Sequence, residues 1–378
     1  MVAFISFAIV VLLFTVLVLT AKASEVTTEL NEGERSYVTQ SRINGYLLLS
    51  FLVLMMAGSA YAFKALMPVM IPKAASVHGV KTDELFNTTM IIILVVFVLT
   101  QVALFYFAYR YNESRVEEAY FYAHNNTLEV VWTIIPTIVL TGLIAMGMYE
   151  WFSIFNKDGR DKNMLVIEAT GKQFNWMLRY SGKDGKFGER IIDTAHITPT
   201  NELGINWNDP KSHDDFMSDK LYLVKGRPVL MKLGAQDVIH SFYLPHFRVK
   251  MDCVPGTPTE FYFTPTMTTE EMRDYLSHLP WWQTTNPETG QPRWQTFKYE
   301  LACAELCGKS HFGMEREVVV VTQKEYDEWL NKQTSLYDAT VKPALAGNDA
   351  ASAPAATSAA GDSSKAAVSK PTAMMIKK

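Results

Sequence analysis

The sequence has few cysteines and little net charge. Its three cysteines, Cys253, Cys303 and Cys307, are too few for a fold that depends on disulfide bonds. The 35 Lys and Arg against 39 Asp and Glu leave a formal charge of −4, which gives no support for nucleic-acid binding. Charged residues make up only 20% of the chain, whereas hydrophobic residues make up 48%. This composition excludes a disordered chain and a disulfide-rich scaffold.

Four long uncharged runs lie within residues 1–152, and they exclude an ordinary soluble enzyme. The runs are Met1–Thr20, Gly45–Phe63, Thr89–Tyr109 and Val130–Tyr149. Each is close to the roughly 20 residues that a helix needs to cross the core of a bilayer. Only a short connection separates the last two. We therefore predict about four transmembrane helices, two over residues 1–67 and a hairpin over residues 85–152.

The first run has two interpretations. The small residues of Ala21-Lys22-Ala23 resemble a signal-peptidase site. However, no Lys or Arg precedes the run, and it is longer than the core of a typical signal peptide. We therefore favour a helix that is retained.

Basic residues in the connections predict the orientation of the helices. The first and third connections together hold five Lys and Arg (Lys22, Arg35, Arg42, Arg110 and Arg115), whereas the second holds three, Lys64, Lys73 and Lys81. Cytoplasmic connections are enriched in basic residues. The large C-terminal part of the chain is therefore predicted to be extracytoplasmic.

Residues 153–342 show a different pattern, with short β-rich runs between Gly and Pro residues. The clearest runs are Met164–Ala169, Phe174–Tyr180, Val229–Leu233, Thr259–Phe263 and Val318–Thr322. Such spacing is typical of a β-sandwich or barrel. A short helix is expected over Lys324–Lys332, and two long loops over residues 201–218 and 266–295. Residues 343–378, rich in Ala, Ser and Lys, are expected to be a disordered tail.

The segment that points to chemistry is Cys303-Ala-Glu305-Leu-Cys307-Gly-Lys-Ser-His311-Phe-Gly-Met314. Thiolates and imidazoles suit copper or zinc, and a thioether favours copper. In one helix Cys303 and His311 would lie about 12 Å apart, which is too far for a shared metal. We therefore predict that a strand ends near Ala302 and that a loop folds back. A second imidazole, His240, is expected at the end of a neighbouring strand.

This segment resembles subunit II of the haem–copper cytochrome c oxidases, whose signature is an upstream His followed by Cys-x-x-x-Cys-x-x-x-His-x-x-Met. The resemblance covers most of residues 85–330. It includes Glu129-Val-Val-Trp-Thr-Ile-Ile-Pro136 in the second helix of the hairpin and Lys250-Met-Asp-Cys-Val-Pro-Gly256 in the β-rich part. It implies a transmembrane hairpin followed by a cupredoxin-like Greek-key domain with a binuclear copper site, CuA.

The resemblance also implies roles for individual residues. The expected copper ligands are His240, Cys303, Cys307, His311, Met314 and the carbonyl oxygen of Glu305. The cysteines would bridge the two coppers. The Glu305 side chain would also reach a Mg²⁺ shared with subunit I. Glu129 is a candidate for the mouth of a proton channel.

One departure from the family concerns the aromatic residue that accepts electrons from cytochrome c. Many members have Trp where this chain has Phe174, although Trp176 remains. Both are candidates for accepting electrons. Trp281, Trp282 and Trp294 in the long insertion could serve a different docking mode, pack their own loop or lie at the membrane surface. The insertion and the two extra helices suggest an unusual donor or a larger supercomplex.

The predicted function is therefore that of an electron-accepting subunit of a proton-pumping oxidase in a bacterial inner membrane, with its C-terminal domain in the periplasm. No Cys-x-x-Cys-His haem site is present, so the cytochrome c or haem-domain donor must be another chain. Alternatives are a CuA-bearing nitric oxide reductase subunit, a membrane-anchored copper chaperone or thiol oxidoreductase, and a structural zinc site. Cys253 is expected to be a buried free thiol, and His213 and His246 are expected to be loop or surface residues.

Overall fold

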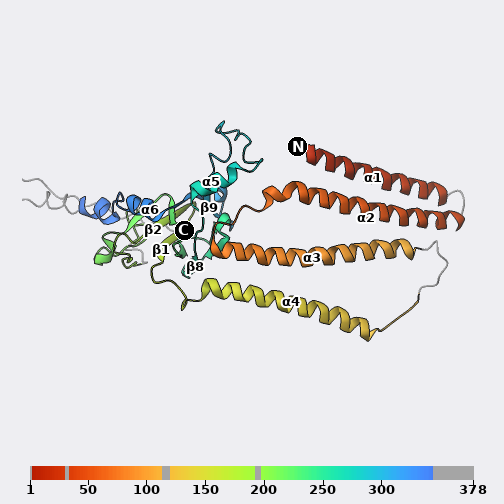
Figure 1. The fold of residues 1–378 in the computed structure, drawn as a ribbon, viewed down its shortest axis with the longest axis horizontal. Helices are drawn as coiled ribbons and strands as arrows, with labels where there is room; N and C mark the ends of the chain where they lie inside the picture. The colour runs from red at the N-terminus through yellow and green to blue at the C-terminus, as the bar shows by residue number, and fades with distance from the viewer. Residues whose placement is uncertain (1, 30–33, 113–119, 192–196, 344–378) are drawn as a thin grey trace, which may run out of the picture.

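The computed structural model describes residues 2–29, 34–112, 120–191 and 197–343. Its long helices lie side by side at one end, and its β-strands form a domain with two short helices at the other (Figure 1). The long helices are α1 (Val2–Glu29), α2 (Glu34–Met70), α3 (Val77–Arg110) and α4 (Asn126–Phe155). Within the described residues, three segments are long and apolar enough to cross a membrane: Val38–Met67, Val77–Arg110 and Asn126–Phe155. The predicted α + β membrane protein is confirmed.

The first apolar run forms most of α1, which packs against α2. The rings of Phe14 and Phe51 lie 5.0 Å apart, and the side-chain amide of Gln40 donates to the carbonyl of Ala21 at 3.1 Å. The helix continues without a break through Ala23. Retention of this segment in the mature protein stays a prediction.

The C-terminal domain is a sandwich of two five-stranded sheets. One sheet has the order β3-β2-β1-β5-β8 and the other has the order β4-β10-β9-β6-β7. The strands are β1 (Leu165–Lys172), β2 (Asn175–Tyr180), β3 (Phe216–Ser218), β4 (Leu221–Val224), β5 (Val229–Ala235), β6 (His240–Leu244), β7 (Val249–Cys253), β8 (Thr259–Phe263), β9 (Tyr299–Cys303) and β10 (Glu315–Val321). The main core of buried apolar side chains in the described residues, including Ile167, Phe242 and Leu301, fills the space between the sheets.

The sequence predicts strands correctly where apolar residues alternate or follow one another directly. The five predicted runs correspond to β1, β2, β5, β8 and β10, and β8 has the predicted bounds. β9 ends at Cys303, one residue beyond the expected Ala302. The predicted long loop over 201–218 is partly wrong, because β3 occupies its last three residues. β3 has too few residues to show a sequence period.

The expectation of a loop over residues 266–295 is also partly wrong, because this insertion contains the helix α5 (Thr269–Ser277). Thr268 and Glu271 form a capping box at its start, and Met272 and Leu276, four residues apart, are buried. These features are readable signals of a short amphipathic helix. The helix predicted near the C-terminus is α6 (Gln323–Leu330). Most of the predicted tail, residues 344–378, lies outside the described residues.

The connection between α2 and α3 joins the membrane part to the sandwich. Ala75 donates its amide hydrogen to the carbonyl of His246 at 2.7 Å, and Ser76 donates its hydroxyl to the carbonyl of Phe247 at 2.6 Å. The Arg248 guanidinium donates to both carboxylate oxygens of Asp83, at 2.8 and 2.9 Å, and to the carbonyl of Pro72 at 2.6 Å. We call Arg248, Asp83 and Pro72 the interdomain latch. It ties the β6–β7 turn to the start of α3.

Candidate metal centre

Pairing of β6 with β9 brings His240 and Cys303 together. Phe242 on β6 lies directly opposite Cys303 on β9. Because side chains two apart on a strand share a face, His240 points to the same face as Phe242 and Cys303. The Nδ1 atom of His240 lies 3.9 Å from the Sγ of Cys303.

The chain after β9 folds back over these residues, as predicted. The amide of Ala304 donates to the carbonyl of Ser241 at 3.0 Å, and the amide of His311 donates to the carbonyl of Gly308 at 3.2 Å. Gly308 has φ of +138°, a conformation that side chains disfavour. A Cβ at this position would also lie 3.0 Å from the Phe174 ring. Glycine therefore permits the tight return that carries the loop back to β10.

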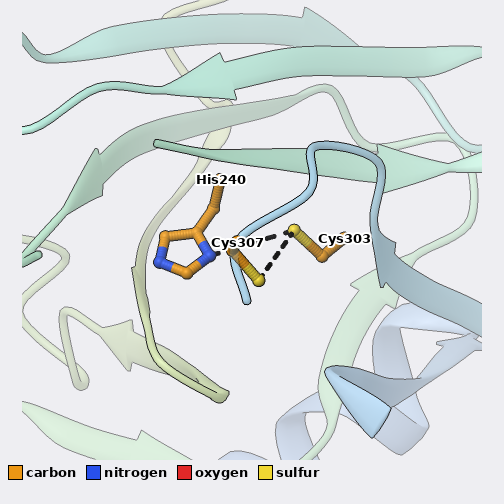
Figure 2. Close-up of side chains that lie close together, drawn as sticks. All are labelled: His240, Cys303 and Cys307. Carbon is orange, nitrogen blue, oxygen red and sulfur yellow. Dashed lines mark hydrogen bonds between the residues drawn. The ribbon is translucent and has the colours of Figure 1, made fainter. Parts of the chain in front are cut away.

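This fold-back gathers the predicted donor atoms in one place. The two cysteine sulfurs lie 4.0 Å apart, and the Sγ of Cys303 lies 3.2 Å from the carbonyl oxygen of Glu305. The Sγ of Cys307 lies 3.5 Å from the Nδ1 of His311 and 3.9 Å from the Sδ of Met314. Figure 2 shows His240, Cys303 and Cys307 converging on one point. Their donor atoms all lie within 4.8 Å of one another.

The two thiols are free and buried. Their separation is about twice the length of a disulfide bond, roughly 2 Å, so the described arrangement is not a disulfide. Burial, together with the neighbouring Cys303, raises the pKa of the Cys307 thiol to about 11. Such a thiol keeps its proton at neutral pH unless a metal cation replaces it. We call the six donor residues, His240, Cys303, Glu305, Cys307, His311 and Met314, the cage. Paired soft sulfurs, imidazoles and a thioether fit copper.

Asp237 orients His240, a role that the sequence did not indicate. Its Oδ1 accepts from the Nε2 of His240 at 2.9 Å, while its Oδ2 accepts from the amide of Gln173 at 2.7 Å. Burial alone would raise the pKa of Asp237, but these hydrogen bonds hold it below its usual value. With Nε2 donating, Nδ1 is left free to face Cys303. The available signal was a carboxylate three residues before the ligand histidine.

The turn between β1 and β2 supports the cage from the other sheet. A Cβ on Gly171 would lie 2.8 Å from the His240 ring, so only glycine leaves room for the imidazole. The Gln173 side chain donates to the carbonyl of Cys307 at 2.6 Å. The indole of Trp176 donates to the carbonyl of Met314 at 3.3 Å. Contacts from the β1–β2 hairpin therefore reach the middle and the end of the loop over residues 304–314, which we call the donor loop.

The two aromatic candidates occupy different places. Trp176 is only 2% exposed, and its ring packs edge-on against His240 and Phe242. It belongs to the core that supports the cage. Phe174 is half-buried and covers Gly308 at the edge of the donor loop. Of the two, Phe174 is the one with a side chain open to a docking protein.

The other residues for which the sequence suggested a role lie away from the cage or at its rim. The Glu305 side chain is exposed, and only its carbonyl oxygen faces Cys303. Glu129 lies in the first turn of α4, at the end of that helix remote from the sandwich (Figure 1). Cys253 pairs with His240 across the strands but stays a buried free thiol, as expected. His246 was expected in a loop or at the surface; it lies in the turn between β6 and β7, where it is half-buried against Phe297.

Comparison with known proteins places the chain among respiratory oxidases. The family model "Cytochrome C oxidase subunit II, transmembrane domain" matches residues 64–150, and the model of the periplasmic domain matches residues 165–269. The alternative cytochrome c oxidase subunit 2 of Bradyrhizobium diazoefficiens is 30% identical over 241 residues, covering 63% of this chain and 75% of that protein. Cytochrome c oxidase subunit 2 of Cereibacter sphaeroides is 25% identical over 269 residues, covering 69% and 77%.

A search of solved structures also found a match to this chain. It is the periplasmic domain of subunit II of the cytochrome oxidase of Bradyrhizobium japonicum, at 26% identity and a TM-score of 0.28. The match covers 45% of this chain and 94% of that one. The periplasmic-domain family match ends before the donor loop at Cys303. The geometry of the cage is therefore an observation separate from the family match.

Proposed function

Because the chain belongs to the cytochrome c oxidase subunit II family, we propose that its C-terminal domain carries a binuclear copper centre and relays electrons from a donor protein to the haem of subunit I. The chain is a component of an oxidoreductase complex. The observation that carries the proposal is the convergence of two thiols, two imidazoles, a thioether and a carbonyl oxygen in one buried cage.

The proposed ligands divide between the two metals by their positions. Cys303 and Cys307 lie between the imidazoles and would bridge. His240 and the Glu305 carbonyl lie beside Cys303, whereas His311 and Met314 lie beside Cys307. When bound, the copper pair would take up and pass on one electron at a time. O₂ reduction and the coupled proton movement would take place in the partner subunit.

The protein's own contribution is to hold the ligands still. Asp237 fixes the His240 ring, Gln173 holds the backbone at Cys307, and Trp176 holds the backbone at Met314. These partners come from strands or turns of the rigid sandwich. Ligands positioned in advance move little when the charge of the site changes, and small movement favours rapid electron transfer.

Two residues at the rim of the cage, Glu305 and Phe174, are proposed to face other proteins. The exposed carboxylate of Glu305 is free to bind a Mg²⁺ shared with subunit I, because its backbone rather than its side chain faces the sulfurs. Phe174, at the edge of the donor loop, is the proposed contact for a cytochrome c or haem-domain donor. Glu129 is proposed to serve proton uptake from the opposite side of the membrane.

The chain is a membrane protein with its C-terminal domain outside the cytoplasm. A bacterial inner membrane fits the similarity to bacterial proteins, and we propose that the sandwich lies in the periplasm.

The test compares two cysteines of the same domain within the assembled oxidase. Cys307→Ser should remove bound copper and abolish donor oxidation, because it deletes the thiolate that lies between His311 and Met314. Cys253→Ser is the matched control, since Cys253 is equally buried but outside the cage. Donor oxidation at the normal rate in Cys307→Ser would remove this site from the electron route.

A further inference from the structure

The insertion of residues 266–295 lies at the end of the sandwich that faces the membrane. The amide of Thr266 donates to the carbonyl of Ala75 at 2.8 Å, and the ammonium of Lys73 lies 5.6 Å from the centre of the Tyr275 ring. Lys73 and Ala75 belong to the connection that follows α2, whose membrane-spanning segment ends at Met67. Figure 1 shows α5 and the loop after it on the side of α1 and α2.

The insertion uses two of its three tryptophans to hold itself in place and leaves one outside. Trp282 packs edge-on against Phe297 at 5.7 Å, and Trp294 packs against the core. Trp281 is instead 51% exposed. The guanidinium of Arg293 lies 5.0 Å from the centre of the Trp281 ring. Tyr275, one helical turn before the loop, is 38% exposed.

We propose that this insertion rests on the headgroup layer of the outer leaflet through Tyr275 and Trp281. Tyrosine and tryptophan favour the interface because one end of each ring system is apolar and the other is polar. Lys73 and Arg293, each beside one of these rings, are placed to bind lipid phosphates.

The net charge of the insertion does not attract it to anionic lipids. The insertion holds four acidic residues, Glu270, Glu271, Asp274 and Glu288, and two basic ones, Arg273 and Arg293. Two of the acids are paired, Glu270 with Arg273 and Glu271 with Lys225. The contact therefore depends on the aromatic rings, and it should form on membranes of zwitterionic lipid. It would give the sandwich a support on the membrane that is separate from the interdomain latch.

Photolabelling from the lipid tests the proposal on the assembled oxidase containing the full chain. The complex is reconstituted in nanodiscs of phosphatidylcholine that includes a lipid with a diazirine close to the headgroup. After illumination, trypsin releases the peptide Asp274–Arg293, which contains Trp281. It also releases Glu325–Lys332 from α6, which lies at the far end of the sandwich (Figure 1). We expect several-fold more label on the first peptide than on the second.

Variants separate the aromatic contact from simple proximity. Trp281→Gln should reduce the label on Asp274–Arg293 to the level of the far peptide, with copper content unchanged. Trp281→Phe, which keeps an apolar ring, should retain part of it. Trp207→Phe, a change beside Tyr337 in the segment that follows α6, should leave the label at the wild-type level. Equal labelling of the two wild-type peptides would overturn the proposal, since it would mean that water or another protein covers this surface.

Discussion

His240 presents Nδ1 to the sulfurs when its ring proton lies on Nε2, and that N–H needs a hydrogen-bond acceptor. Asp237 supplies that partner, and the same carboxylate is held by the amide of Gln173. The sequence indicated His240 from its place in the family signature. The Gln173 contact was not predictable, because it spans 64 residues and depends on how the sheets stack. The resemblance to the family thus indicated the donors, whereas the residues that support them could be found only from the fold.

Replacing Asp237 by Ala should lower copper affinity by about 10- to 100-fold, because the imidazole loses the bond that fixes its tautomer and angle. Competition against a copper chelator measures this change. Asp252→Ala is the matched control, since Asp252 is an exposed carboxylate on the neighbouring β7. Equal affinity in the Asp237→Ala and Asp252→Ala proteins would show that Asp237 does not orient the ligand.

At the scale of elements, the β6–β7 hairpin connects the copper cage to the membrane. His240 begins β6 at one end, and Arg248 follows the turn at the other. The hydrophobic runs predicted the helices and most of the strands that surround this hairpin. They gave no sign of the interdomain latch, because Arg248 and Asp83 are 165 residues apart. The helix α5, in contrast, carried its capping box in the sequence and was readable there.

Breaking the latch should loosen the connection between α2 and α3. Asp83→Asn removes the charge that pairs with a mostly buried guanidinium, at a cost of about 1–2 kcal/mol in local stability. Trypsin should then cut after the exposed Lys73 roughly 5- to 30-fold faster, because the buried residues that follow it open more often. Glu84→Gln, a change at the adjacent exposed carboxylate, should leave the cleavage rate unaltered. Equal rates for the two variants would contradict the proposed role of the latch.

At the scale of the whole molecule, the structure predicts a loss of stability in acid. Burial, followed by the charge of Arg248, lowers the pKa of His246 from 6.5 to about 4. Because the unfolded state binds the proton more readily, this histidine's contribution is complete above pH 6.5 and is lost as the pH falls toward 4. The loss amounts to about 2–3 kcal/mol.

His246→Phe should therefore flatten the decline in melting temperature between pH 6.5 and 4. Tryptophan fluorescence of the solubilised full chain during heating would measure it. His278→Phe is the control, since His278 is exposed at the end of α5. A decline that is as steep in His246→Phe as in the wild type would mean that His246 does not govern acid sensitivity.

If the cage is a binuclear centre, it binds two coppers that share an electron. Copper analysis combined with EPR spectroscopy of the purified full chain would show this. We predict two coppers per chain and a spectrum in which one unpaired electron couples to both copper nuclei. One copper with an ordinary single-nucleus spectrum, or zinc in place of copper, would contradict the account.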